Sequence, residues 1–140
     1  MAPSSSRSRG VTRLGRPPAG GRGGASVTIR VDFGPHGALG PGKVRLMELV
    51  GRHGSITAAG KAMGMSYRRA WLLIDGLNRV FAAPLVAAQH GGALGGGASL
   101  TELGATIMKH YRAIERRTAA GATLHLKALE RALAKKPPKR

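Results

Sequence analysis

A strict alternation of apolar and polar residues is the first regular pattern along the chain, and it covers residues 26–33. The positions on one side of this alternation are all apolar: Val27, Ile29, Val31 and Phe33. Because successive side chains of a strand point to opposite faces, the pattern predicts a half-buried strand. The pair Gly34-Pro35 ends it, and Gly40-Pro41-Gly42 predicts a turn before the next element.

Apolar residues then recur at helical spacing in three segments, at about 43–52, 56–63 and 67–81. Ser55 and Ser66 precede the second and third segments, where a hydroxyl can cap a helix N-terminus, and Gly54 predicts the end of the first helix. The second helix is short and consists mostly of Ala and Gly, so another helix can approach it closely. The third helix has an apolar stripe formed by Ala70, Ile74, Leu77 and Phe81.

A hairpin and a long helix are predicted for the rest of the chain. Residues 85–90 and 98–100 are expected to be its strands, on either side of a glycine-rich loop at 91–97. Thr101 begins the long helix, which extends to about Arg117 with Leu103, Ile107, Tyr111 and Ile114 as its apolar stripe. Gly121 predicts an interruption, after which helical spacing continues to about Ala134. The expected fold is therefore mainly α with a small β component.

The charge of the chain indicates a polyanionic partner. Its 23 Lys and Arg against 6 Asp and Glu give a net charge of +17 over 140 residues, and nucleic acid is the usual partner of such a protein. Residues 1–25 hold five Arg, no acid and almost no large apolar residue, so we expect a disordered basic tail. Residues 26–120 are expected to form the domain, and 121–140 a helical extension with a second basic tail.

Several classes of site are not expected. The absence of cysteine excludes disulfides and thiol chemistry, and no apolar run is long enough to span a membrane. The five histidines show no metal-binding spacing, and the six acidic residues form no convincing acid–base pair. The glycine run lacks the Gly-Lys-Ser/Thr ending of a phosphate loop. We therefore expect no enzyme, no metal and no cofactor.

The order of helices and hairpin predicts a winged helix-turn-helix that binds double-stranded DNA. In such a domain the start of the second helix of the motif meets base edges and phosphates in the major groove, and the hairpin forms the wing. The candidate DNA-binding residues lie on the short helix, the start of the third helix and the wing: Ser55, Thr57, Lys61, Ser66, Tyr67, Arg68, Arg69, Gln89 and His90. Trp71 lies one turn after Tyr67; it either contacts DNA or, as the favoured interpretation, packs against the neighbouring helix or the wing.

Residues 54–71, GSITAAGKAMGMSYRRAW, closely resemble the helix-turn-helix of ModE-type molybdate-responsive transcriptional regulators. The wing agrees, since Pro84-Leu85-Val86 is followed by a glycine run and by Leu100-Thr101-Glu102-Leu103-Gly104, an ending that also resembles LysR-type winged helices. The similarity covers about residues 27–117. It implies a cytoplasmic, nucleoid-associated homodimer, joined through the first helix and the long helix, that regulates transcription, with molybdenum-related genes as candidate targets.

Members of that family also carry a C-terminal pair of small β-barrel molybdate-binding domains. This sequence has no strand-rich segment after its long helix, so we expect no molybdate binding by this chain. Two other functions stay open. One is a sequence-tolerant protein that coats DNA mainly through its charge, and the other is a protein-interaction module that uses the wing and the long helix.

Overall fold

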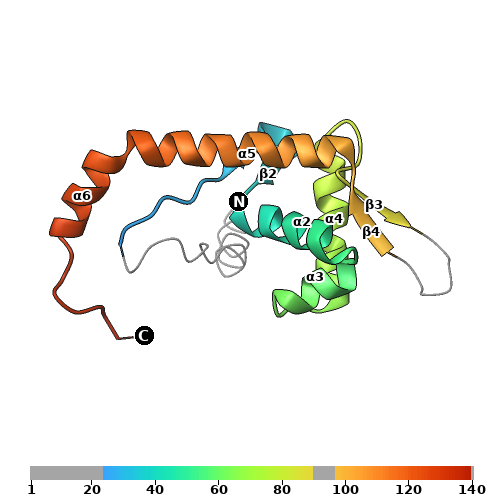
Figure 1. Ribbon diagram of the computed structural model, residues 1–140, viewed down its shortest axis with the longest axis horizontal. Coiled ribbons are helices and arrows are strands. Elements are labelled where there is room, and N and C mark those ends of the chain that lie inside the picture. Colours follow the sequence, from blue (N-terminus) through green and yellow to red (C-terminus); the bar gives the residue numbers. More distant parts are fainter. Residues whose placement is uncertain (1–23, 90–96, 140) are drawn as a thin grey trace.

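The computed structural model describes residues 24–89 and 97–139. These residues form three crossing helices, a small hairpin beside them and a long helix that lies across them (Figure 1). The three crossing helices are α2 (Pro41–His53), α3 (Ile56–Ala62) and α4 (Tyr67–Val80). The hairpin consists of β3 (Val86–Gln89) and β4 (Gly97–Leu100), and the long helix is α5 (Glu102–Gly121), followed by α6 (Thr123–Arg131). None of the described helices is both long and apolar enough to cross a bilayer.

The strand predicted over 26–33 is wrong for most of its length. Only β1 (Val31–Asp32) is a strand, and it pairs antiparallel with β2 (Ala38–Leu39) across a 3₁₀ turn at Gly34–His36. The alternation of burial is nevertheless present, because the four apolar side chains of this segment are partly buried and the polar ones between them are exposed. The Tyr111 hydroxyl of α5 donates a hydrogen bond to the Ile29 carbonyl at 2.7 Å. The segment is therefore extended against a helix and has no neighbouring strand along most of its length.

Helix α2 forms the centre of the hydrophobic core. It begins two residues before the predicted start, because Pro41 is well suited to a first helical turn and needs no hydrogen-bond acceptor there. It ends as predicted at Gly54, whose backbone is left-handed (φ 71°) and whose N–H donates to the Val50 carbonyl at 2.8 Å. All its apolar side chains are buried within the chain: Val44, Leu46, Met47, Leu49 and Val50. They therefore contribute little to the predicted dimer contact.

Helices α3 and α4 pack closely, as the small residues of α3 predict. A Cβ atom added to Gly60 would lie only 2.9 Å from the Cβ of Ala70, so this crossing requires glycine. The chain turns between the two helices at Gly64, which is also left-handed (φ 71°). The predicted stripe of α4 is confirmed, with Ala70, Ile74 and Leu77 buried and Phe81 just beyond the helix end.

The hairpin is confirmed for its described residues. Strands β3 and β4 are antiparallel, with Val86 opposite Leu100 and Ala88 opposite Ala98. Each strand differs from its predicted start by one residue. The predicted loop up to residue 96, together with His90, lies outside the described residues.

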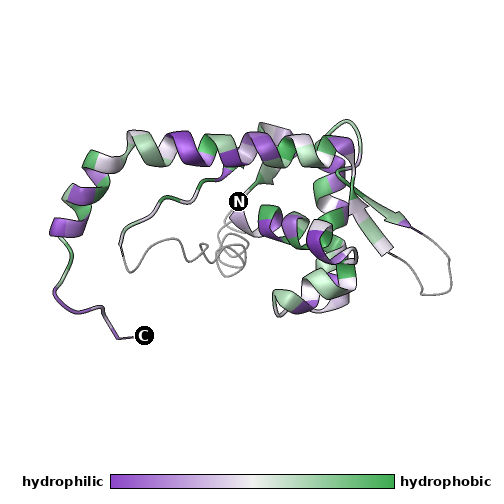
Figure 2. Ribbon diagram, viewed as in Figure 1, coloured by the Kyte–Doolittle hydropathy of each residue, from purple (hydrophilic) through white to green (hydrophobic). Residues whose placement is uncertain are grey.

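The long helix is interrupted where Gly121 predicted an interruption. Helix α5 begins after Thr101, whose side chain accepts from the Gly104 N–H at 2.9 Å, and the break at Ala122 separates it from α6. The apolar stripe of α5 is buried at Tyr111 and exposed at Ile114. Helix α6 ends at Arg131, three residues before the predicted end, and carries exposed leucines between hydrophilic residues (Figure 2). The C-terminal part of α5 and helix α6 thus present apolar side chains to solvent.

Two side chains fasten α5 to the elements beneath it. The Arg112 guanidinium lies 2.7 Å from a Glu115 carboxylate oxygen and 3.4 Å from one of Glu48 on α2. Burial opposes its charge, but hydrogen bonds and attraction from both carboxylates prevail and raise the pKa of Arg112. Burial also raises the pKa of Tyr111 to about 12; Glu115 adds to this rise and Arg112 opposes it.

Candidate nucleic-acid interface

The first turn of α4 presents polar side chains to solvent. The Ser66 hydroxyl accepts a hydrogen bond from the Arg69 N–H at 3.1 Å, which confirms Ser66 as the N-cap. Tyr67, Arg68 and Arg69 follow it and are exposed, whereas the opposite side of α4 is buried in the core. The helix therefore has one side fixed by packing and a first turn open to a partner.

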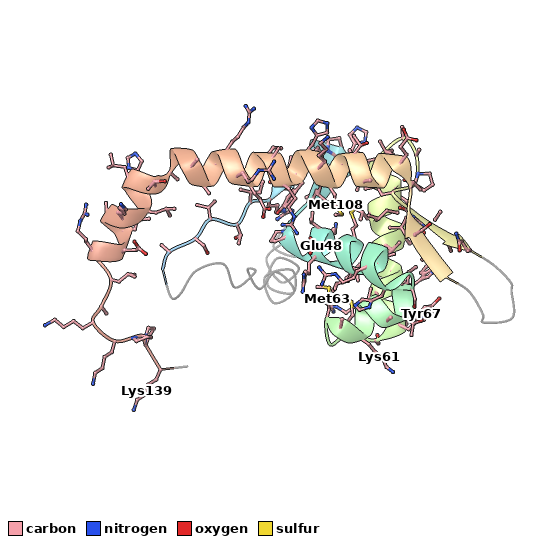
Figure 3. The ribbon with its side chains drawn as sticks, viewed as in Figure 1. Glu48, Lys61, Met63, Tyr67, Met108 and Lys139 are labelled. Carbon is pink, nitrogen blue, oxygen red and sulfur yellow. The ribbon has the colours of Figure 1, made fainter. Side chains whose placement is uncertain are left out.

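Helix α3 adds further exposed polar groups next to this turn. The Ser55 hydroxyl accepts from the Ala58 N–H at 3.0 Å, so it too is an N-cap as predicted. Thr57 and Lys61 are exposed, and Figure 3 shows Lys61 and Tyr67 pointing away from the core at the α3 end of the molecule. Within the described part of the chain, Lys61, Arg68 and Arg69 form no ion pair. Their charges are available to an anionic partner.

An open hollow of about 410 Å³ lies between α3, α4 and the hairpin. Four of the predicted site residues meet around it: Ser55, Thr57, Tyr67 and Gln89. The remaining lining residues are small or apolar: Ile56, Trp71, Ala88, Gly97 and Ala98. Of the other predicted residues, Lys61, Ser66, Arg68 and Arg69 lie outside this lining and are exposed, and His90 lies outside the described residues.

Trp71 is less buried than expected for a residue packed against a neighbouring helix or the wing. Its side chain is 44% exposed and forms a wall of the hollow. The core side of α4 is already occupied by Ala70 and Ile74, so Trp71 lies at the edge that faces the hairpin. The hairpin residues opposite it, Ala88 and Ala98, are too small to cover an indole ring.

Leu72 and Asn78 lie on the same helix outside the lining of the hollow, and sequence reasoning missed both. Leu72 is 51% exposed on the side of α4 opposite the core. This large apolar residue was not among the candidate site residues that the sequence predicted. The Asn78 side chain links α4 to the base of the hairpin: its oxygen accepts from the N–H groups of Leu85 (2.8 Å) and Val86 (3.1 Å), and its nitrogen donates to the Val86 carbonyl (2.9 Å). A lone Asn within a helical pattern does not indicate its partners.

This surface is positively charged, and it includes one ion pair in which an acidic residue neutralises an arginine. Arg79 and Asp75 lie one turn apart on the outer half of α4, 2.9 Å from each other. None of the residues that line the hollow is acidic. In the part of the chain that the structure describes, no three His, Asp or Glu come together as a potential metal-binding group. The surface suits an anion with apolar features more than a cation.

Comparison with known proteins finds relatives named for molybdenum binding, molybdenum transport and transcriptional regulation. The chain is 41% identical over 95 residues to the molybdenum-pterin-binding protein MopB of Rhodobacter capsulatus, an overlap of 68% of this chain and 34% of MopB. It is 41% identical over 91 residues to the molybdenum transport protein ModE of Azotobacter vinelandii, which covers 65% of this chain and 33% of that relative. The chain is a relative of the ModE and Mop proteins.

Another relative is named for its role in transcription. The DNA-binding transcriptional dual regulator ModE of Escherichia coli K12 is 35% identical over 71 residues, covering 51% of this chain and 27% of that protein. The chain thus spans about a third of the length of the first two ModE and Mop relatives. No protein-family model matches it. The resemblance to ModE-type regulators in the sequence therefore agrees with these relatives.

Proposed function

We propose that this chain is a winged helix-turn-helix protein that binds double-stranded DNA in a sequence-specific manner. Helices α3 and α4 are the helix-turn-helix, α4 is the recognition helix, and the β3–β4 hairpin is the wing. The observation that carries the proposal is the capped first turn of α4, where Tyr67, Arg68 and Arg69 are exposed while Ala70 behind them is fully buried. A recognition helix needs this division between a fixed side and an open N-terminal turn.

Each cation has a role that follows from its place on the helices. Arg68 lies in line with Leu72 and Arg79 on the side of α4 away from the core, so it is the residue to enter the major groove and donate two hydrogen bonds to guanine. Arg69 lies toward the flank of α4, and Lys61 lies in the last turn of α3, so both contact phosphates. Ser55, Thr57, Ser66, Tyr67, Gln89 and His90 complete the interface with hydroxyl, amide and imidazole groups.

The biological role that we propose is transcriptional regulation of the ModE type. Relatives named as transcriptional regulators support it, and relatives named for molybdenum transport or molybdenum-pterin binding make molybdenum-related genes the candidate targets. Binding to the chromosome would place the protein at the nucleoid in the bacterial cytoplasm. Residues 26–120 are the proposed DNA-binding unit, and the tails on either side add affinity without specificity.

We propose a homodimer whose contact is formed by α5 and α6. Ile114, Leu124 and Leu129 are exposed there, whereas the apolar residues of α2 are buried within one chain. Two copies would place two recognition helices in successive major grooves of a two-fold-related site. Sedimentation equilibrium of the 140-residue chain measures the mass, and Leu129→Asp is expected to shift it toward the monomer.

The proposed function is tested by selecting duplexes from a random pool with the purified chain. Affinity for a selected duplex and for a scrambled one is then measured at three salt concentrations. We expect a ratio of specific to non-specific affinity of about 10³ or more that persists as salt rises. Lys135→Ala, which removes an exposed charge beyond the end of α6, is the control for a general loss of charge.

Two results would refute it. A ratio near one, with binding that disappears at moderate salt, would identify a protein that coats DNA through its charge. If the chain binds DNA no more tightly than an equally basic unfolded peptide does, the remaining hypothesis is a protein-interaction module.

A further inference from the structure

Three large apolar side chains of α4 are exposed: Tyr67 and Trp71 beside the hollow, and Leu72 on the side of the helix away from the core. Tyr67 is 55% exposed, and Trp71 and Leu72 are 44% and 51% exposed, within six residues of one helix. The other exposed large apolar residues of the described part of the chain lie on α5, on α6 and just beyond the end of α6. A group of exposed apolar side chains on a charged protein indicates a contact surface.

The chemistry around this group limits what can bind to it. Arg68 precedes Leu72 by one helical turn, and the lining of the neighbouring hollow contains no carboxylate. Trp71, Ile56, Ala88 and Ala98 give the hollow an apolar wall. The ligand should therefore carry negative charge close to a small apolar group.

The size of the patch argues for DNA over a protein partner. A stable protein interface covers about 800 Å² on each side, which is more than three side chains on one helix present. In the major groove of DNA, the C5-methyl group of thymine is the apolar feature that distinguishes one base pair from another. This methyl group lies close to the negatively charged phosphates. It therefore matches a surface that combines the positive charge of Arg68 with an apolar wall.

We propose that Leu72 and Trp71 recognise thymine through its C5-methyl group. Arg68 supplies the hydrogen bonds to base edges, and the two apolar side chains remove one methyl group each from water. This inference rests on the proposed function, since it requires that α4 enters the major groove. It adds a class of base that the polar residues of the interface do not select.

The direct test deletes the methyl group and changes nothing else in the base-pairing edge. In a duplex selected by the chain, each thymine is replaced in turn by deoxyuridine, and affinity is measured at fixed salt. Burial of one methyl group corresponds to about a threefold to fivefold change in affinity. We expect that loss at one or two thymines within the site and none at thymines outside it.

A double-mutant cycle assigns the methyl group to a side chain. Leu72→Ala is combined with each deoxyuridine substitution, and Trp71→Ala is treated in the same way. If Leu72 contacts a methyl group, its removal should abolish the penalty at that thymine, so the two losses do not add. Leu133→Ala is the matched control, because Leu133 is an exposed leucine beyond the end of α6 (67% exposed) and outside the proposed dimer contact, and it should leave every penalty unchanged.

Circular dichroism and thermal unfolding of each variant show whether the fold is retained. Leu72→Ala removes an exposed side chain, so it keeps the test valid if Trp71→Ala unfolds the hairpin. Specific binding with no penalty at any thymine would overturn the inference and leave the proposed function standing. Penalties that persist unchanged in both variants would also overturn it. Absence of any preferred duplex would overturn the proposed function and the inference together.

Discussion

The hydrogen bonds of Asn78 give a strong prediction about how the hairpin is held. The substitution Asn78→Ala removes two bonds to the N–H groups of Leu85 and Val86 and one to the Val86 carbonyl. Leu85 and Val86 are both buried, so water does not replace these bonds without opening the base of the hairpin. Each bond contributes about 1 kcal/mol net, which makes about 3 kcal/mol for the three.

Alanine offsets part of this loss, because its helix propensity exceeds that of asparagine by about 0.6 kcal/mol. The free energy of unfolding should therefore fall by about 2 kcal/mol. In urea this corresponds to a midpoint lower by about 1–2 M with an unchanged slope. Hydrogen exchange should locate the loss, with the Leu85 and Val86 amides losing protection while those of α2 change only with global stability.

The matched control is Arg79→Ala on the next residue of the same helix. It removes an exposed ion pair with Asp75 and should change stability by less than about 0.5 kcal/mol. The reasoning is refuted if Asn78→Ala is as stable as this control, or if its Leu85 and Val86 amides stay protected.

Four further predictions concern binding, pH and the chain ends. Arg68→Ala should weaken binding to a selected duplex by about 1–3 kcal/mol and relax the preference at one base pair, whereas Arg69→Ala should weaken binding to all duplexes alike; a competition assay against single-base variants separates the two. Because the pKa of Tyr111 is raised to about 12, the protonated hydroxyl stabilises the fold below pH 10, and this contribution is lost as pH rises from about 10 to 12; Tyr111→Phe should lack that loss in urea titrations, and parallel pH profiles would contradict it. Removing residues 1–25 and 136–140, which carry eight basic residues, should lower the salt dependence of DNA binding but keep the ratio of specific to non-specific affinity; a ratio that collapses would assign sequence recognition to the tails. Calorimetry with molybdate should show no saturable site, because the cations Lys61, Arg68 and Arg69 are exposed to water and lie outside the lining of the hollow, so they do not form an enclosed set of donors for an oxyanion; a stoichiometric micromolar site that discriminates against sulfate would disprove this.

Local chemistry made parts of the fold predictable. Ser55 and Ser66 directly precede helical patterns, where a hydroxyl can accept a hydrogen bond from a backbone N–H of the first turn. Both cap helices at the predicted positions. Gly54 lies where a left-handed residue is needed, and the stripe of α4 follows from its spacing. These features depend on residues within one or two turns, so sequence alone determines them.

Features that depend on distant neighbours were not predictable. The alternation over 26–33 reports which side is buried, but not that Ile29 accepts a hydrogen bond from Tyr111 on α5, 82 positions further along the chain. Trp71 was expected to be covered, yet its cover depended on the size of Ala88 and Ala98 on the hairpin. The role of Asn78 became clear only from the fold, which places Leu85 and Val86 within hydrogen-bonding distance of its side chain. The predicted contacts of Arg68, Lys61 and the other site residues with DNA stay predictions.

The close crossing of α3 and α4 divides the residues of this motif into two groups for protein engineering. Gly60 and Ala70 leave no room for a larger side chain, so a library that varies them would consist mostly of unfolded variants. Arg68, Leu72 and Gly76 lie on the other side of α4, are exposed, and touch no part of this crossing. Randomising those three positions therefore changes the exposed surface of α4 while the scaffold stays intact. Under the proposed function, exchanging a few side chains of this one helix would give new preferences for DNA sequence.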